Sequence, residues 1–363
     1  MSNAIEHFSR ARIDDTTLQV MADSQKGLAR LIEEEKSVIR HYVGLGHWPH
    51  KRVNMFVIEN LKPLVAQIKR TTAVSSIVAE DVDCRPMVNV YDAADLSECA
   101  VFVNRGMLER DGTWGDALAL RALLAHEHGH PLSENETVHA ARELAVEISE
   151  DGAVSEASVG DILHLLANQI CLHAPQEVFA NEIAIRAGFG SALFHLNRDA
   201  VAKSRLGVSK RPTLVQSLDK RVAEGKLSAE QTAALLLIVD LQAHLGFALE
   251  TAAFLRAGHP REAKALEESL SEGVWVHLDP EAKRLYETLR EHYLRLKGNL
   301  TPAQTKAWAS EVLAFLADVL RQKNLPVRFE AVRRRPEPKQ TLRSQSEPAA
   351  AHGSVSDANG GSL

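Results

Sequence analysis

LLAHEHGH, residues 123–130, is the stretch that decides how this chain is interpreted, because it carries a His-Glu-x-x-His pattern within a run of helical spacing. Histidines four positions apart lie one turn apart on the same helix face, so His126 and His130 can bind one cation together. Glu127 can then polarise a water on that cation and pass its proton to a leaving amine. The pattern predicts zinc held by His126 and His130, with Glu127 as general base. The alternative is a surface helix with clustered histidines.

His128 stands between the two predicted ligands and, on a helix, points away from them. We expect it to support the site or to face solvent rather than to bind the ion. No third histidine follows at the spacing typical of metzincins, because the chain continues with Pro131 and turns. The third ligand must therefore come from elsewhere in the sequence.

The best candidate for that ligand is Glu177, in the stretch PQEVFANEIA at residues 175–184. Glu177, Ala180 and Asn181 share one helical face, where the small alanine would allow a close approach to the metal-binding helix. Asn181 could accept a hydrogen bond from a ligating histidine and fix its tautomer. The rival carboxylates are Glu143, Glu147 and Glu182.

Hydrophobic spacing predicts two N-terminal helices, at 15–43 and 51–69. Valine-rich stretches at 73–78, 86–91 and 100–103 are separated by turn residues and predict a small antiparallel sheet.

The metal-binding helix is expected to begin after Asp116 as its N-cap and to stop at Pro131. A capping-box sequence at 133–136 predicts another helix that runs to about Ser149. The remainder is predicted to be mainly helical, at 157–173, 175–187 and 191–205 and then almost continuously from 214 to 324.

Composition limits the class of protein. The net charge of −6 argues against nonspecific nucleic-acid binding as the main activity. Cys84, Cys99 and Cys171 form no CxxC pair, which indicates reduced thiols and predicts no cysteine-based zinc site.

No membrane segment is expected. The N-terminus lacks the apolar stretch of a signal peptide. The apolar segment 232–255 is interrupted by polar and charged residues, so we predict a buried helix rather than a membrane span. We therefore expect a soluble, cytoplasmic protein. The tail from about Arg333 is rich in Arg, Pro, Ser and Gly, which predicts disorder.

The order of several segments resembles the HtpX-type and CAAX-prenyl-type zinc metallopeptidases, which are gluzincins. The segments are NVY at 89–91, VFVNRGML at 101–108, LAHEHGH at 124–130, the Glu-x-x-Ala-Asn pattern at 177–181 and GHPREAK at 258–264. The resemblance covers about residues 85–270. Asn181 stands where that family has Asp, which makes this segment more similar to the IrrE-like metallopeptidases. HtpX-type and CAAX-type enzymes are membrane-embedded, so their substrate class is not carried over.

The resemblance implies a zincin-like core. Together with the helical patterns at both ends of the chain, it predicts an α+β, predominantly helical fold with a small sheet and helical extensions. We therefore expect an N-terminal helical region (1–70), a metallopeptidase domain (71–270), a C-terminal helical region (271–332) and a disordered tail (333–363). The resemblance also implies that the strand at 100–104 is the edge that pairs with substrate, unless this is an ordinary buried strand.

His259 is the remaining candidate that the resemblance suggests. It would stabilise the oxyanion as a second electrophile beside zinc. The alternative is that His259-Pro260 only marks the start of a helix.

These observations together predict a zinc-dependent metallopeptidase that hydrolyses an unidentified protein or peptide. The alternative is a regulatory or partner-binding protein on a metallopeptidase fold, with conditional or absent proteolysis. A nonpeptide zinc hydrolase is a third possibility. The oligomeric state is left open, and other divalent ions bind similar ligands.

Overall fold

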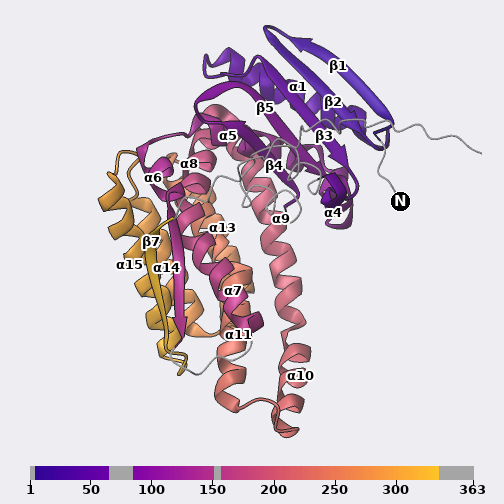
Figure 1. Ribbon diagram of the computed structural model, residues 1–363. Coiled ribbons are helices and arrows are strands. Elements are labelled where there is room, and N and C mark those ends of the chain that lie inside the picture. The colour runs from indigo at the N-terminus through magenta and orange to yellow at the C-terminus, as the bar shows by residue number, and fades with distance from the viewer. Residues whose placement is uncertain (1–4, 65–84, 151–156, 335–363) are drawn as a thin grey trace, which may run out of the picture. The chain divides into compact units, whose positions relative to one another are not determined.

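The computed structural model describes residues 5–64, 85–150 and 157–334 (Figure 1). The described residues up to Arg333 belong to one compact unit. The predicted strand at 73–78 and nearly all of the predicted disordered tail lie outside the described residues. Within the described residues the fold is mostly helical with a small mixed sheet, which confirms the predicted α+β class at this level.

The main sheet has five strands in the order β1-β2-β3-β5-β4. Its strands are β1 (His7–Ile13), β2 (Thr16–Ala22), β3 (Arg52–Ile58), β4 (Met87–Asp92) and β5 (Asp95–Asn104). The pairs β1/β2 and β4/β5 are antiparallel, while β2/β3 and β3/β5 are parallel. The antiparallel pairing predicted for 86–91 and 100–103 is present in β4 and β5, but the sheet as a whole is mixed and not antiparallel as predicted.

The N-terminal region was predicted to be helical, but it begins with the two strands β1 and β2. The helix expected at 15–43 is replaced in its first part by β2, and α1 occupies only Leu28–Gly44. In β2, Leu18 and Val20 are buried and alternate with partly exposed neighbours, which is the period of a strand. Asp14, in the turn between β1 and β2, has a positive φ of 50°, as tight hairpins require.

The prediction of a helix at 51–69 is also wrong at its start, because residues there alternate with the period of a strand and form β3. Val53, Met55 and Val57 are completely buried at every second position, and they place β3 in the middle of the sheet.

The strands expected at 86–91 and 100–103 are confirmed as β4 and β5. However, β5 lies between β3 and β4, so the prediction that residues 100–104 form an edge is wrong. Val101 and Val103 are completely buried, which agrees with the alternative of an ordinary interior strand. The edge strand on this side is β4, whose neighbour within the described residues is β5 alone.

The helix that carries the histidines is α5 (Ala117–Leu132). Asp116 caps it as predicted, because its side chain accepts hydrogen bonds from the amides of Leu118 and Ala119. Pro131 does not end the helix but lies in its last turn. A proline there leaves the carbonyl of Glu127 without its usual helical donor, and the side-chain amide of Asn89 donates to that carbonyl instead, at 3.1 Å.

The segment after α5 differs from the prediction of one helix to Ser149. A short helix, α6 (Glu136–Arg142), is capped by Asn135 and followed by β6 (Leu144–Glu150). β6 pairs antiparallel with β7 (Val327–Arg333), which is nearly two hundred residues away in the sequence. A strand whose partner is so distant leaves no local signal of its pairing.

The remaining elements are helical. They are α4 (Arg105–Arg110), η1 (Thr113–Gly115), α7 (Ala157–Ala167), η2 (Asn168–His173), α8 (Ala174–Ala184), η3 (Ile185–Phe189), α9 (Gly190–Ser209), α10 (Arg211–Ala223), α11 (Ala229–His244), α12 (Gly246–Arg256), α13 (Pro260–Gly273), η4 (Trp275–His277), α14 (Pro280–Leu294) and α15 (Pro302–Arg321). The prediction of helices is confirmed for those from α7 onward, whereas α4 and η1 lie where no helix was predicted.

Three helices and the edge strand surround α5. It packs against α1, α8 and α9, and β4 lies along it (Figure 1). The glycine at position 129 allows the contact with α8, because a Cβ there would lie 2.6 Å from the carbonyl oxygen of Ala180. The close approach agrees with the prediction made from Ala180, whereas the part played by Gly129 was not predicted.

One stretch of the described residues, Ala229–Arg256, is long and apolar enough to cross a membrane by length and composition. It contains α11 and α12, and 56% of its most apolar window is buried inside the protein. The core helix of a globular protein passes the same test.

Candidate metal centre

His126, His130 and Glu177 come together as the sequence predicts. Their donor atoms all lie within 4.8 Å of one another. Oε2 of Glu177 is 3.1 Å from Nε2 of His126 and 4.0 Å from Nε2 of His130. Two imidazole nitrogens and one carboxylate oxygen are a donor set that suits a divalent ion such as zinc. These residues can hold a metal ion.

Charge in this group is distributed unevenly. Burial alone would lower the pKa of His126, but the hydrogen bond and the negative charge of Glu177 outweigh it and raise the pKa to about 9. Burial and the neighbouring His126 lower the pKa of His130 to about 3. Burial opposes ionisation of Glu177, yet Arg85 and the two histidines hold the pKa of that carboxyl well below its usual range. Without metal, the site therefore pairs an imidazolium with a carboxylate.

Asn181 fixes the orientation of the His126 ring. Its Nδ1 lies 2.8 Å from Oδ1 of Asn181, which leaves Nε2 directed at Glu177. Asn181 in turn donates to Glu250 at 3.1 Å, and Asn197 donates to the same carboxylate oxygen at 3.0 Å. The predicted role of Asn181 agrees with this geometry, whereas Glu250 and Asn197 carry no local motif that sequence reasoning could have used.

His130 and Glu177 have their own neighbours. The amide of Gln176 lies 3.2 Å from Nδ1 of His130. Arg85 forms an ion pair with Oε1 of Glu177 at 2.9 Å, which leaves Oε2 for the histidines. Gln176 directly precedes the ligand and could have been noticed, but Arg85 stands 92 positions from Glu177.

Glu127 is buried beside the ligands and is held by the edge strand. The backbone N–H of Asn89 in β4 donates to Oε2 of Glu127 at 2.8 Å. Burial raises the pKa of Glu127 to about 7, a value suited to proton transfer near neutral pH. The side chain is therefore positioned by β4 next to His126.

The rival carboxylates lie outside this group. Glu143 and Glu147 are exposed, and Glu143 pairs with Arg333 at 3.3 Å. Glu182 is buried, but it forms ion pairs with Arg186 and Arg256.

His259 is the N-cap residue of α13 and is followed by Pro260, as the helix-start alternative expected. Its Nδ1 lies 3.5 Å from Glu262, and its ring contacts Phe254. Within the described residues, no hydrogen bond, ion pair or ring contact joins it to the metal-binding group. A role for His259 at the oxyanion stays a prediction.

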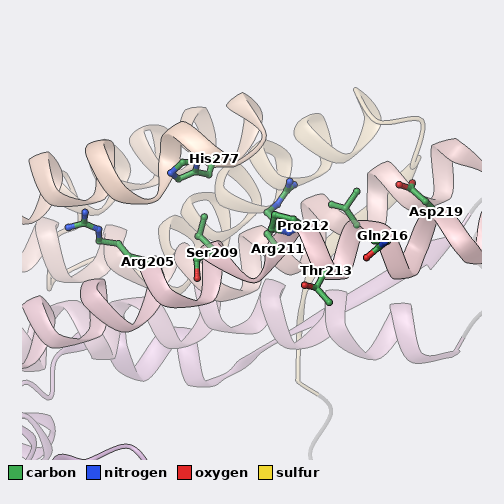
Figure 2. Close-up of a pocket in the computed structure, with 10 residues that line it drawn as sticks. Arg205, Ser209, Arg211, Pro212, Thr213, Gln216, Asp219 and His277 are labelled. Atoms are coloured by element: carbon green, nitrogen blue, oxygen red, sulfur yellow. The ribbon is translucent and has the colours of Figure 1, made fainter.

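A pocket of about 800 Å³ lies elsewhere on the helical part of the chain. Figure 2 shows its wall, built from Arg205 and Ser209 of α9, Arg211 and Asp219 of α10, and His277 of η4. None of the metal-binding residues lines this pocket.

The chain was compared with known proteins by sequence and by structure. No protein-family model matches it, and no curated protein or solved structure is significantly similar to it.

Proposed function

We propose that this protein is a zinc-dependent metallopeptidase with a zincin-like core, acting on a protein or peptide. The observation that carries the proposal is the position of Glu127. It is one residue from a ligand on α5, buried, and hydrogen-bonded to the edge strand β4. A site that only bound a structural ion would not need a second, non-ligating carboxylate held in this way.

Each residue has a role in this proposal. His126, His130 and Glu177 hold the ion, which supplies a Lewis acid that polarises a carbonyl and lowers the pKa of water. Glu127 accepts a proton from the attacking water and then donates it to the leaving amine. Asn181 keeps Nδ1 of His126 protonated, so that Nε2 is free to bind the ion.

The edge strand suggests how a substrate is held. One side of β4 pairs with β5. On its other side β4 faces α5, where the N–H of Asn89 donates to Glu127. An extended peptide can add to such an edge through main-chain hydrogen bonds. β4 therefore replaces residues 100–104 as the proposed substrate-binding strand.

The test is digestion of a complex peptide library by the zinc-loaded protein, with the products read by mass spectrometry. Glu127→Gln should keep its zinc and lose about 10²–10⁴-fold in cleavage rate. Glu147→Gln, which changes an exposed glutamate outside the site, should cleave like wild type. Equal cleavage by Glu127→Gln and wild type would contradict the proposal. Zinc-loaded wild type that cleaves nothing would favour the regulatory, partner-binding alternative.

A further inference from the structure

A second group of metal-binding side chains lies on the opposite side of α5. His50, Cys99 and His128 each offer one donor atom, and these atoms lie within 4.8 Å of one another. At most 3% of the surface of any of the three is exposed. His50 lies just before β3, Cys99 is in β5, and His128 lies between the two histidines of the first site.

The imidazoles of His50 and His128 each use one ring nitrogen in a hydrogen bond, and in each ring the other nitrogen is not used by that bond. Nδ1 of His50 lies 2.5 Å from the carbonyl oxygen of Leu96, to which it must donate, so Nε2 keeps its lone pair. Nε2 of His128 lies 2.8 Å from the carboxylate of Glu35, so a proton there leaves the lone pair on Nδ1. Nε2 of His50 and Nδ1 of His128 are buried and have no hydrogen-bond partner among the described residues.

Unpartnered buried nitrogens are uncommon, because native proteins satisfy nearly all of their buried polar groups. A bound ion is one of the few partners that explain such atoms. A histidine that binds a metal commonly donates its other N–H to a carboxylate or a backbone carbonyl. Glu35 and Leu96 supply these two partners here. Both histidines thus already have the outer hydrogen bonds of ligands, without the ion.

We propose that His50, Cys99 and His128 form a second metal site, for a divalent ion of the zinc type. A thiolate sulfur and two imidazole nitrogens are ligands that zinc binds well. Glu35 is completely buried and contributes a second negative charge when Cys99 is a thiolate. Two negative charges balance a divalent ion, which matters because uncompensated charge is costly inside a protein.

The site would join parts of the chain that lie far apart in sequence. Through its ligands and Glu35, the ion links α1, the segment before β3, the interior strand β5 and α5. His126 and His130 project from the other face of α5, so the second ion would brace the helix that carries the first site. The proposal does not depend on the peptidase function.

The test uses cobalt(II) as a spectroscopic substitute for zinc. Because the ligands are buried, the protein is expressed in cobalt-supplemented minimal medium, so that the ion can enter during folding. Thiolate-bound cobalt gives a near-ultraviolet charge-transfer band that a His₂Glu site cannot give. We expect this band in wild type. In Cys99→Ser we expect the intensity of the band to be at least tenfold lower.

Two control variants locate the band. Cys171→Ser removes another buried thiol, one that donates to the carbonyl of Ala309, and should keep the band. Glu177→Gln should also keep it while losing one cobalt per chain, which separates this proposal from the first site. Folded wild type that contains cobalt but shows no band would overturn the proposal, whatever the variants do. A band that persists in Cys99→Ser, or that disappears in Cys171→Ser, would also overturn it.

Discussion

Nδ1 of His126 lies 2.8 Å from Oδ1 of Asn181, one helical turn beyond Glu177 on α8. The same helix thus carries Glu177, the proposed third ligand, and Asn181, which orients the ring of His126. This relationship accounts for the spacing of Glu177 and Asn181, and it connects the metal-binding group to Glu250 and Asn197 behind it.

Asn181→Ala should weaken zinc binding by about 10–100-fold, because the ring of His126 loses the acceptor that fixes its tautomer and orientation. Asn181→Asp should keep most of the affinity, since a carboxylate can accept the same hydrogen bond. The measurement is zinc affinity by competition with a chromophoric chelator. Asn197→Ala is the control, because Asn197 donates to Glu250 without contacting His126. Unchanged affinity in Asn181→Ala would contradict the role given to Asn181.

Gly129→Ala should disturb the contact between α5 and α8. The added Cβ would lie 2.6 Å from the carbonyl oxygen of Ala180, which is backbone and cannot rotate away. We expect a loss of about 1–3 kcal/mol in the free energy of unfolding, together with weaker zinc binding. Chemical denaturation and metal analysis check both effects.

Gly207→Ala is the matched control for that substitution. Gly207 is also helical, in α9, and a Cβ there meets nothing within 4 Å. This variant should keep its zinc and be as stable as wild type or slightly more stable. Equal behaviour of the two variants would show that α5 and α8 are not in close contact.

Stability should fall in mild acid, partly through His292. Burial against Trp308 and Phe315 lowers the pKa of His292, so the folded protein keeps this ring neutral. The unfolded chain takes up a proton near its ordinary pKa of about 6.5. The contribution of His292 to folding is therefore present above about pH 6.5 and is lost as the pH falls below that value.

His292→Gln removes this titration, so its free energy of unfolding should change less between pH 7 and pH 5 than that of wild type. His277→Gln, at an exposed position, should keep the wild-type pH dependence. Urea unfolding at the two pH values measures the difference. If the free energy of unfolding changes equally between pH 7 and pH 5 in His292→Gln and wild type, His292 does not contribute to the pH dependence.

The metal-binding group was largely predictable because its signals are local. His126 and His130 lie on one turn of a helix, and Glu177 and Asn181 lie on one turn of another, so helical geometry alone relates each pair. What spacing could not provide is the arrangement of the two helices. Arg85, Asn89 and Glu250 reach the site from other elements and were not identified as part of it.

The N-terminal strands show why part of the fold was missed. Leu18, Met21 and Leu28 happen to fit helical spacing, and this outweighed the alternation of Leu18 with Val20 and Ala22. The Asp14-Asp15 pair between two such runs was the available hairpin signal. The parallel pairing of β2 with β3, and the pairing of β6 with β7, are long-range contacts that no local pattern encodes.

The second group of ligands was missed for the same reason. Cys99 has no cysteine nearby, and His128 was expected to support the first site or to face solvent, whereas it is completely buried. His50, Cys99 and His128 approach one another only after the sheet and α5 have packed.

The zinc content of purified Glu177→Gln, beside wild type and Glu147→Gln, tests most directly whether His126, His130 and Glu177 bind one metal ion. Elemental analysis should find one zinc per chain fewer in Glu177→Gln than in wild type, whatever the second site holds. Glu147→Gln, which alters an exposed carboxylate once considered as a ligand, should match wild type. Equal zinc in Glu177→Gln and wild type would contradict the claim, and loss of zinc in Glu147→Gln alone would move the third ligand to Glu147.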